Sequence, residues 1–234
     1  MREISICIPT WQRTDLLFEC FEKVKGNDNI TEIVIVDDAS DWKIWEEIQE
    51  RAKDNPKIKL FRNDVNLDCY ANKHRSIELA SNQWCCLWDS DNVFDFGYLY
   101  SLFQILDWKK DTIYTPDFAM PTFSFQQFSG LLITKGNVAG WVDAPMFSTM
   151  LNAANYFVNR DEYLRVWDGS GIDPVTSDSI FTTYNWLAAG NKIQVVDGLH
   201  YQHRIHPHGH YNNNVARTPA GFHESILNKL RNLT

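Results

Sequence analysis

Residues 84–92 have the sequence WCCLWDSDN, and this stretch indicates the fold more strongly than any other part of the chain. Its first five residues are bulky and apolar, a pattern that predicts a strand buried on both faces, as in a parallel sheet. Two carboxylates, Asp89 and Asp91, stand at the end of this strand. Open α/β sheets bind ligands at the carboxyl edge of their strands, so the stretch also predicts a binding site.

The residues before this stretch alternate between strand and helix patterns. Apolar runs predict strands at residues 4–8, where Pro9 ends the run, at 33–36 and at 58–61. Apolar residues at helical spacing predict amphipathic helices at residues 14–25, around Trp45, and at 70–80. Strands that alternate with helices predict right-handed βαβ units, and therefore an α/β fold with a mainly parallel sheet flanked by helices.

The pattern becomes less regular after residue 95. We predict a helix at residues 96–110 that Asp95 caps, with Leu99, Leu102 and Leu106 on its apolar face. Short strands are predicted within residues 112–140, at 155–158 and at 192–196, and helices at 161–166, 178–189 and from Ala220 onward. No repeat, low-complexity tract or linker interrupts the chain, so we predict a single domain with two functional halves.

The composition of the chain argues against some partners and some locations of the protein. A formal net charge of -8 argues against nucleic acid as a partner, because binding long polymers requires basic surface. The five cysteines form no CxxC pair and the N-terminus has no signal-peptide core, so we expect a reducing, cytoplasmic location. No apolar stretch approaches the roughly 20 residues that span a bilayer. We therefore expect a soluble protein for which peripheral membrane contact stays open.

The motif Asp89-Ser90-Asp91 (DXD) is the first candidate for chemistry. Carboxylate oxygens suit Mg2+ or Mn2+, which bind few protein ligands and take the rest from water and phosphate. A metal held there could bridge a diphosphate and offset the charge that develops on a leaving group. The alternative is a simple strand-end turn, since Asp and Ser are both favoured in turns.

Further polar residues follow the first two predicted strands, and so belong at the same edge. Asp38 follows residues 33–36, and a carboxylate there could accept hydrogen bonds from a base N–H or a ribose hydroxyl. Its alternative use, capping the next helix, is already available to Ser40 or Asp41. After the first strand, the ring of Trp11 could stack on a base and the guanidinium of Arg13 could meet a phosphate.

Four blocks carry a resemblance to a known family. They are residues 6–13 (ICIPTWQR), 35–40 (IVDDAS), 66–77 and 88–91 (WDSD). In order and spacing they resemble family 2 glycosyltransferases, which have the GT-A, Rossmann-like fold, over roughly the first hundred residues. The resemblance implies one GT-A domain at residues 1–234, with a nucleotide-binding half at 1–95 and an acceptor-binding half at 96–234.

The resemblance also implies roles for individual residues. Thr10, Trp11 and Asp38 would hold the nucleoside, and Asp89 would face the ribose. Lys73 stands where the family commonly has an arginine near the donor phosphates, and Asp68 where a glycine is usual. The nucleotide-sugar site expected in this way comprises Pro9, Thr10, Trp11, Arg13, Asp38, Lys73, Asp89, Ser90 and Asn155. Asn155 and Asn152 precede a predicted strand and could hydrogen-bond a donor hexose, or alternatively form a turn.

The general base is sought in the second half. Asp178 lies twelve residues before Gly190, close to where the family places an acidic pair, although here Ser177 replaces one of the two acids. In the family this acid activates the acceptor hydroxyl, and the displacement inverts the anomeric centre. The alternative is that Asp178 caps the helix at residues 179–189, and Asp173 is the second candidate for the base.

Residues 200–210, HYQHRIHPHGH, contain five of the seven histidines. The family typically supplies one histidine to the metal after its last core strand, and His203 suits this role best, with His206 next. A metal set of Asp89, Asp91 and His203 would favour Mn2+ over Mg2+, because a histidine is the softer ligand. The alternative for any one of these histidines is a solvated loop.

Together these features predict an inverting glycosyltransferase. It would move a sugar from a nucleotide-diphosphate sugar, with a UDP-sugar favoured, to a hydroxyl of a glycan or glycoconjugate. A metal-dependent nucleotidyltransferase is one alternative, but such enzymes have a Gly-rich phosphate loop and residues 9–17 contain no glycine. A non-catalytic carbohydrate-binding protein is the other, and it would not explain the acids collected at strand ends.

Overall fold

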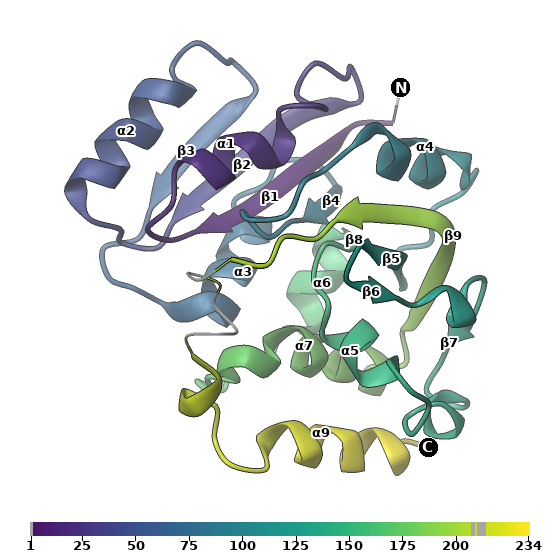
Figure 1. Ribbon diagram of the computed structural model, residues 1–234. Helices are drawn as coiled ribbons and strands as arrows, with labels where there is room; N and C mark the ends of the chain where they lie inside the picture. The colour runs from purple at the N-terminus through teal and green to yellow at the C-terminus, as the bar shows by residue number, and fades with distance from the viewer. Residues whose placement is uncertain (1, 207–208, 210–213) are drawn as a thin grey trace.

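The computed structural model describes residues 2–206, 209 and 214–234. In the first half strands and helices alternate, as predicted (Figure 1). The elements are β1 (Ile4–Thr10), α1 (Asp15–Phe21), β2 (Ile30–Asp37), α2 (Trp42–Ala52), β3 (Ile58–Arg62), α3 (Asp68–Glu78) and β4 (Trp84–Leu87).

The second half is a mixture of short and long elements. It contains α4 (Phe96–Gln104), β5 (Thr112–Met120), β6 (Phe123–Ser124), β7 (Leu132–Ile133), α5 (Phe147–Asn152), β8 (Phe157–Asn159), α6 (Arg160–Val166), α7 (Asp178–Ala188), β9 (Lys192–Gln202) and α9 (Phe222–Arg231). Short 3-10 helices are η1 (Gln126–Phe128), η2 (Val138–Gly140), η3 (Val175–Ser177) and η4 (Val215–Arg217). No helix among the described residues is long and apolar enough to cross a bilayer.

Nine strands of the described chain form one sheet, in the order β3-β2-β1-β4-β8-β5-β9-β7, with β6 paired to β5. The first four strands in this order are parallel, and so are β5 and β9. Strand β8 runs antiparallel to both of its neighbours and joins the two parallel groups. The predicted α/β class with a mainly parallel sheet is confirmed, and β4 lies near the middle of the sheet.

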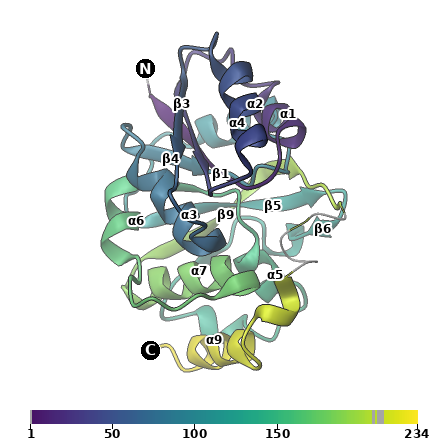
Figure 2. The same ribbon diagram turned by 90° about the vertical axis from the view of Figure 1, so that its left-hand side faces the viewer.

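The direction of each connection between parallel strands determines on which face of the sheet its helix lies. From β1 to β3 the chain moves in one direction across the sheet, and from β3 to β4 it returns. Right-handed crossovers therefore put α1 and α2 on one face and α3 on the other, as Figure 2 shows. On that second face α3 contacts both α6 and α7, which come from the other half of the chain.

Strand β4 is buried as its sequence predicts. Cys85, Cys86, Leu87 and the following Trp88 are fully buried, and only Trp84 is partly exposed. Trp88 packs against Phe94, Tyr98 and Tyr201, with ring centroids 4.2 to 5.6 Å apart. Burial of this apolar run on both faces fixes the position from which Asp89 leaves the sheet.

Among the predicted boundaries in the first half, the ends of the first strand and of the first helix were wrong. Strand β1 continues through Pro9 to Thr10, where it still pairs with β2. It pairs with β4 only over Ser5–Cys7, so at Pro9 one side of the strand has no ladder that would require an N–H. Helix α1 ends at Phe21, four residues before the predicted end, and residues 22–26 form turns.

The helix predicted at residues 96–110 is shorter than expected. Asp95 is the N-cap, as predicted, and its side chain accepts hydrogen bonds from the N–H groups of Gly97 and Tyr98. The helix ends at Gln104, and Leu106, placed on the apolar face in the prediction, is 91% exposed. The chain folds back there because buried Trp108 donates from Nε1 to the carbonyl of Leu102 at 3.2 Å.

The long strands of the second half were underestimated. Strand β5 has nine residues and β9 has eleven, where short strands at 112–140 and 192–196 were predicted. They pair in parallel from Thr112 with Lys192 to Met120 with Gln202. Strand β9 therefore includes His200, which the sequence had placed in the histidine-rich loop. Helix α5 was not predicted.

Candidate active site

Polar residues from three strands meet at one edge of the sheet. Thr10 ends β1, Asp38 directly follows β2, and Asp89 follows β4 after one residue. The Asp38 N–H donates to the Thr10 carbonyl at 2.9 Å, which joins the ends of β1 and β2. The Trp88 N–H donates to the Cys7 carbonyl at 2.9 Å and does the same for β4. The structure thus brings the predicted residues of the first half together.

The nucleoside end of this edge is built around Asp38. Its Oδ1 accepts hydrogen bonds from Asn63 Nδ2 at 2.7 Å and from the Leu67 N–H at 2.8 Å. Burial raises the pKa of Asp38 despite these bonds. The carboxylate is not a helix cap, since Asp41 occupies the N-cap position of α2.

The predicted nucleoside residues at the end of β1 differ in their exposure. Pro9 and Thr10 are buried in β1, and within the described part of the chain Thr10 Oγ1 has no hydrogen-bond partner. Trp11 is 49% exposed just beyond the strand. A buried hydroxyl without a partner is costly. The exposed ring of Trp11 provides an apolar face on which a flat ligand could stack.

Lys73 connects the two halves of the chain. Its ammonium group, from α3, lies 2.7 Å from Asp178 Oδ2 and 3.2 Å from Asp89 Oδ1. It also donates to Ser179 Oγ at 3.3 Å. Burial by itself would lower the pKa of Lys73, but the two carboxylates outweigh burial and raise the pKa well above its usual value. Lys73 therefore stays charged at neutral pH.

Asp178 is the first residue of α7, and Ser177 occupies the N-cap position. The Asp178 carboxylate contacts Lys73 and, at 3.5 Å, Cys69 Sγ, and both of these residues belong to α3. The carboxylate is thus directed toward the neighbouring helix, which does not fit the capping alternative. Asp173, the second candidate for the base, accepts from the Val175 N–H and lies 4.0 Å from Arg217.

Asp91 is held by two basic side chains. Its Oδ2 lies 2.7 Å from Arg13 Nη1 and 3.0 Å from His206 Nε2. Burial would raise the pKa of Asp91, but the hydrogen bond from His206 and the charge of Arg13 lower it to about 2. Arg13 also donates to Ser90 Oγ at 3.5 Å. Arg204 bonds the Asp91 carbonyl and fixes this loop from the other side.

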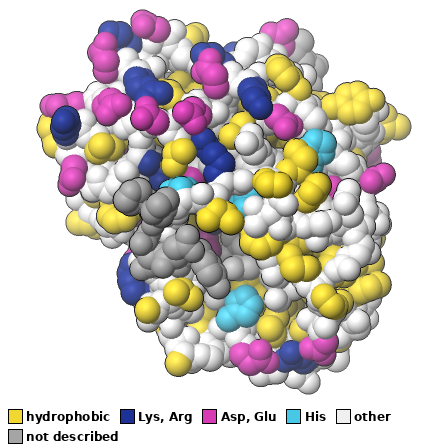
Figure 3. Space-filling view, in the orientation of Figure 1, with side chains coloured by type: hydrophobic (Ala, Val, Ile, Leu, Met, Phe, Trp, Pro, Cys, Tyr) yellow, Lys and Arg dark blue, Asp and Glu magenta, His cyan; other side chains and the backbone are white. Residues whose placement is uncertain are grey.

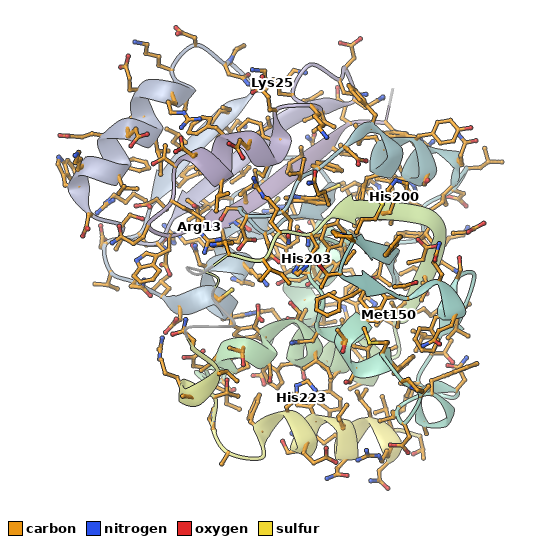
Figure 4. All side chains as sticks on the ribbon, viewed as in Figure 1. Arg13, Lys25, Met150, His200, His203 and His223 are labelled. Carbon is orange, nitrogen blue, oxygen red and sulfur yellow. The ribbon has the colours of Figure 1, made fainter. Side chains whose placement is uncertain are left out.

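The structure distinguishes His203 from His206. His203 Nδ1 lies 3.1 Å from Thr122 Oγ1, and its ring is 5.2 Å from that of Phe123, so it packs against the turn between β5 and β6. Burial lowers the pKa of His203. Of these two, His206, the second choice from the sequence, contacts Asp91 (Figure 4 labels Arg13 and His203 at this edge). His208 and His210 lie outside the described residues.

A divalent metal would fit this loop with few protein ligands. Among the described residues no three His, Cys, Asp or Glu side chains are grouped as a metal site. Asp91 and His206 nevertheless lie within 3.0 Å of each other, as two ligands of one ion would. Mg2+ and Mn2+ commonly take only one or two protein ligands and complete their shell with water and phosphate. Asp89, also expected as a ligand, is engaged with Lys73 instead.

Both asparagines near β8 have structural contacts. Asn155 has a left-handed backbone (φ 70°), and its Oδ1 accepts from the Asp89 N–H at 2.8 Å. Its carbonyl accepts from Tyr98 Oη at 3.0 Å. Asn152 donates to the Thr176 carbonyl at 2.9 Å and accepts from the Ile180 N–H. These contacts fit the turn alternative, in which the asparagines hold the segments that carry Asp89 and Asp178.

Asp68 takes the conformation that a glycine would favour. Its φ is 63°, a left-handed value that aspartate tolerates better than most residues. Asn66 Oδ1 accepts from the Asp68 N–H at 2.9 Å, and the Asp68 carboxylate lies 2.6 Å from Arg217. The loop therefore keeps a glycine-like shape at this position, and the added carboxylate binds the C-terminal segment.

Two residues of the edge were missed in the sequence. Asn63 directly follows β3, so the rule that found Asp38 would also have found it. Arg204 bonds residues in α1 and in the loop after β4, more than a hundred positions away, and no local pattern indicates such contacts.

The family model for glycosyl transferase family 2 matches residues 5–129, just over half of the chain. The chain belongs to this family. WcaA of Escherichia coli (strain K12), described as a glycosyl transferase of colanic acid biosynthesis, is 26% identical over 190 residues, 70% of this chain and 65% of its own. A Campylobacter jejuni GalNAc(5)-diNAcBac-PP-undecaprenol beta-1,3-glucosyltransferase is 28% identical over 106 residues, 44% of this chain and 34% of its own. The chain thus spans less than two thirds of either relative.

Solved structures share the fold of this family 2 chain. The crystal structure of S. aureus TarS superposes with a TM-score of 0.67 at 14% identity, covering 98% of this chain and 43% of TarS. Mannosyltransferase PcManGT from Pyrobaculum calidifontis, in complex with GDP-Man and Mn2+, gives 0.65 at 12% identity, covering 99% of this chain and 69% of its own. At such low identity the likeness establishes the fold, and the expected GT-A architecture is confirmed.

Proposed function

We propose that the protein is an inverting, metal-dependent glycosyltransferase that uses a UDP-sugar donor and a hydroxyl acceptor on a glycan or glycoconjugate. Family membership supports the reaction class. The observation that carries the finer proposal is the position of Lys73, whose ammonium group contacts both Asp89 and Asp178. It places a carboxylate of the second half beside the edge where the strands of the first half end.

The donor would lie along this edge. Trp11 would stack on the base, Asp38 would accept a hydrogen bond from it, and Asp89 would accept one from the ribose. Pro9, Thr10 and Ser90 would line the path between these groups. Two of the solved neighbours, forms of TarS, were crystallised with UDP-GlcNAc and with UDP, and this favours uridine as the nucleoside.

The charges at the site support a divalent cation. Arg13 and Lys73 face three carboxylates, Asp89, Asp91 and Asp178, so these residues alone leave no surplus of positive charge for a diphosphate. Mn2+ or Mg2+ held by Asp91 and His206 would supply that charge and stabilise the leaving diphosphate. We place His206 in this role instead of His203 because His206 contacts Asp91.

In this proposal Asp178 is the general base. The acceptor hydroxyl gives its proton to the Asp178 carboxylate while its oxygen bonds to the anomeric carbon, and the bond from that carbon to the diphosphate oxygen breaks. One displacement of this kind inverts the anomeric centre. Lys73 holds the carboxylate in place and keeps it from turning toward solvent.

The test measures UDP release from UDP-glucose and UDP-N-acetylglucosamine in the presence of Mn2+, with water as the hydroxyl that receives the sugar. We expect the wild-type protein to turn over one of these donors and Asp178→Asn to lose about 100-fold or more in rate, since positioned bases contribute roughly 100- to 10,000-fold. UDP affinity, measured by calorimetry, should stay unchanged in Asp178→Asn. Normal turnover by this variant would show that Asp178 is not the base.

A further inference from the structure

The turn immediately before Asp178 is held by the C-terminal segment of the chain. Thr218 Oγ1 lies 2.6 Å from Thr176 Oγ1 and 3.3 Å from the Thr176 N–H that donates to it. Ser177 Oγ lies 3.2 Å from His223 Nδ1, and Figure 4 shows His223 on the side of α9 that faces α7. These contacts act on the two residues that precede Asp178 in the sequence.

The opposite side of the same turn is anchored by α5. Asn152, the last residue of this helix, donates to the Thr176 carbonyl at 2.9 Å and accepts from the Ile180 N–H at 3.1 Å. Thr176 and Ser177 are buried between the two anchors, with 6% and 2% exposure. Thr218 is partly exposed and is not one of the core residues, so its hydroxyl can be removed without opening the apolar core.

The C-terminal segment also reaches the helix that carries Lys73. Arg217 Nη2 lies 2.6 Å from Asp68 Oδ2, at the first residue of α3, and 4.0 Å from Asp173 Oδ2. Residues 217–223 therefore contact the starts of both α3 and α7. Lys73 and Asp178 project from these two helices and meet at 2.7 Å.

We propose that Thr218, supported by Arg217 and His223, is a positioning residue that sets where the Asp178 carboxylate lies relative to Lys73. The effect of this positioning on catalysis rests on the function proposed above. The effect of Thr218 on the position of the carboxylate does not depend on that function. Proton transfer from an acceptor requires a base within hydrogen-bond reach, and a displacement of about 1 Å can cost about 100-fold in rate.

Cys69 provides a readout that is independent of catalysis. Its Sγ lies 3.5 Å from Asp178 Oδ2, and it is partly exposed, whereas the four other cysteines are buried. Burial raises the pKa of the Cys69 thiol, and the nearby Asp178 carboxylate raises it further. If Asp178 moves away, the thiolate becomes easier to form and its reaction with iodoacetamide becomes faster.

The experiment compares labelling of Cys69 in four proteins. Thr218→Val keeps the side-chain shape but loses the hydroxyl, and we expect it to label several-fold faster than wild type. Thr218→Ser keeps the hydroxyl and should label at the wild-type rate. Ser225→Ala is the matched control, because the Ser225 hydroxyl donates to the Phe222 carbonyl within its own helix. A Cys69→Ser protein identifies the labelled site.

Enzyme assays then connect position to rate. Thr218→Val should lower the rate of UDP release by about 10- to 100-fold at unchanged KM for the donor, and Thr218→Ser should restore it. Arg217→Met, a surface change, serves as a second variant should Thr218→Val fold poorly, and it should also accelerate labelling. Wild-type labelling rates in both variants would overturn the positioning role. If Cys69 labelled faster in the variants but the wild-type protein itself released no UDP, the proposed function would be overturned and the positioning role would stand.

Discussion

At the scale of single residues, the site is a set of charges that compensate each other. Lys73 is almost fully buried and lies between Asp89 and Asp178, and Arg13 and His206 share one oxygen of Asp91. A buried charge is tolerated when it is paired, and removing one partner leaves the other uncompensated. The residues proposed for catalysis are therefore also residues on which stability depends.

Replacing Lys73 tests this dependence. We expect Lys73→Met to lower the free energy of unfolding by about 3 to 5 kcal/mol, because it leaves Asp89 and Asp178 without their shared cation. The double variant Lys73→Met/Asp178→Asn should recover part of the loss, since one of the two uncompensated charges is gone. Urea unfolding at pH 7 measures both, with Lys53→Met, in an exposed pair with Glu50, as the control that should change nothing measurable. If the single and double variants lost the same free energy of unfolding, Lys73 would not be compensating the charge of Asp178.

At the scale of elements, the sequence predicted best the strands and helices whose burial follows from the pattern of their own residues. The apolar run before Asp89 predicted β4, and the helical pattern that begins at Asp178 predicted α7, so the elements that carry these two acids were predicted. The long pairing of β5 with β9 was missed because it joins residues about 80 positions apart, and local patterns carry no signal for it. For the same reason the contacts of Arg204 and Arg217 were not predicted.

The end of α4 shows a different limit. Spacing alone put Leu106 on an apolar face, but the helix stops before it because Trp108 folds back on Leu102. A periodic pattern states which side chains could share a face, and only packing determines where the helix ends. The histidine-rich stretch is similar: its composition suggested a ligand, and only the fold distinguishes His206 from His203.

A buried side chain of the central strand β4 should contribute more to stability than an exposed apolar side chain elsewhere. Leu87 is fully buried directly before the active-site loop, so we expect Leu87→Ala to lower the free energy of unfolding by about 2 to 5 kcal/mol through lost burial and a cavity. Leu106→Ala, the same change at a 91% exposed position, should stay within about 0.5 kcal/mol of wild type. Urea unfolding of the two variants measures the difference. Similar losses would mean that β4 is not the buried centre of the sheet.

At the scale of the whole molecule, the two halves meet at the site while sharing one sheet. Acidic and basic side chains are interspersed over the part formed by the N-terminal elements, and apolar side chains gather on the other side of the visible face (Figure 3). The site takes Asp38 and Asp91 from the first half, and His206 and Asp178 from the second. A molecule bound across it would therefore contact both halves and oppose their separation during unfolding.

Ligand binding should consequently stabilise the whole chain, and the metal should be required for the full effect. At a UDP concentration 100 times its Kd with Mn2+ present, we expect about 2.7 kcal/mol of stabilisation, or a rise in Tm of about 5 to 10 °C. EDTA should remove most of this rise, and so should Asp91→Asn, which weakens the proposed metal pair with His206. Asp143→Asn, an exposed carboxylate paired with Arg231, is the matched control and should respond like wild type. If UDP alone raised Tm as much as UDP with Mn2+, the diphosphate would be neutralised by Arg13 and Lys73 without a metal, and the charge argument for the cation would be wrong.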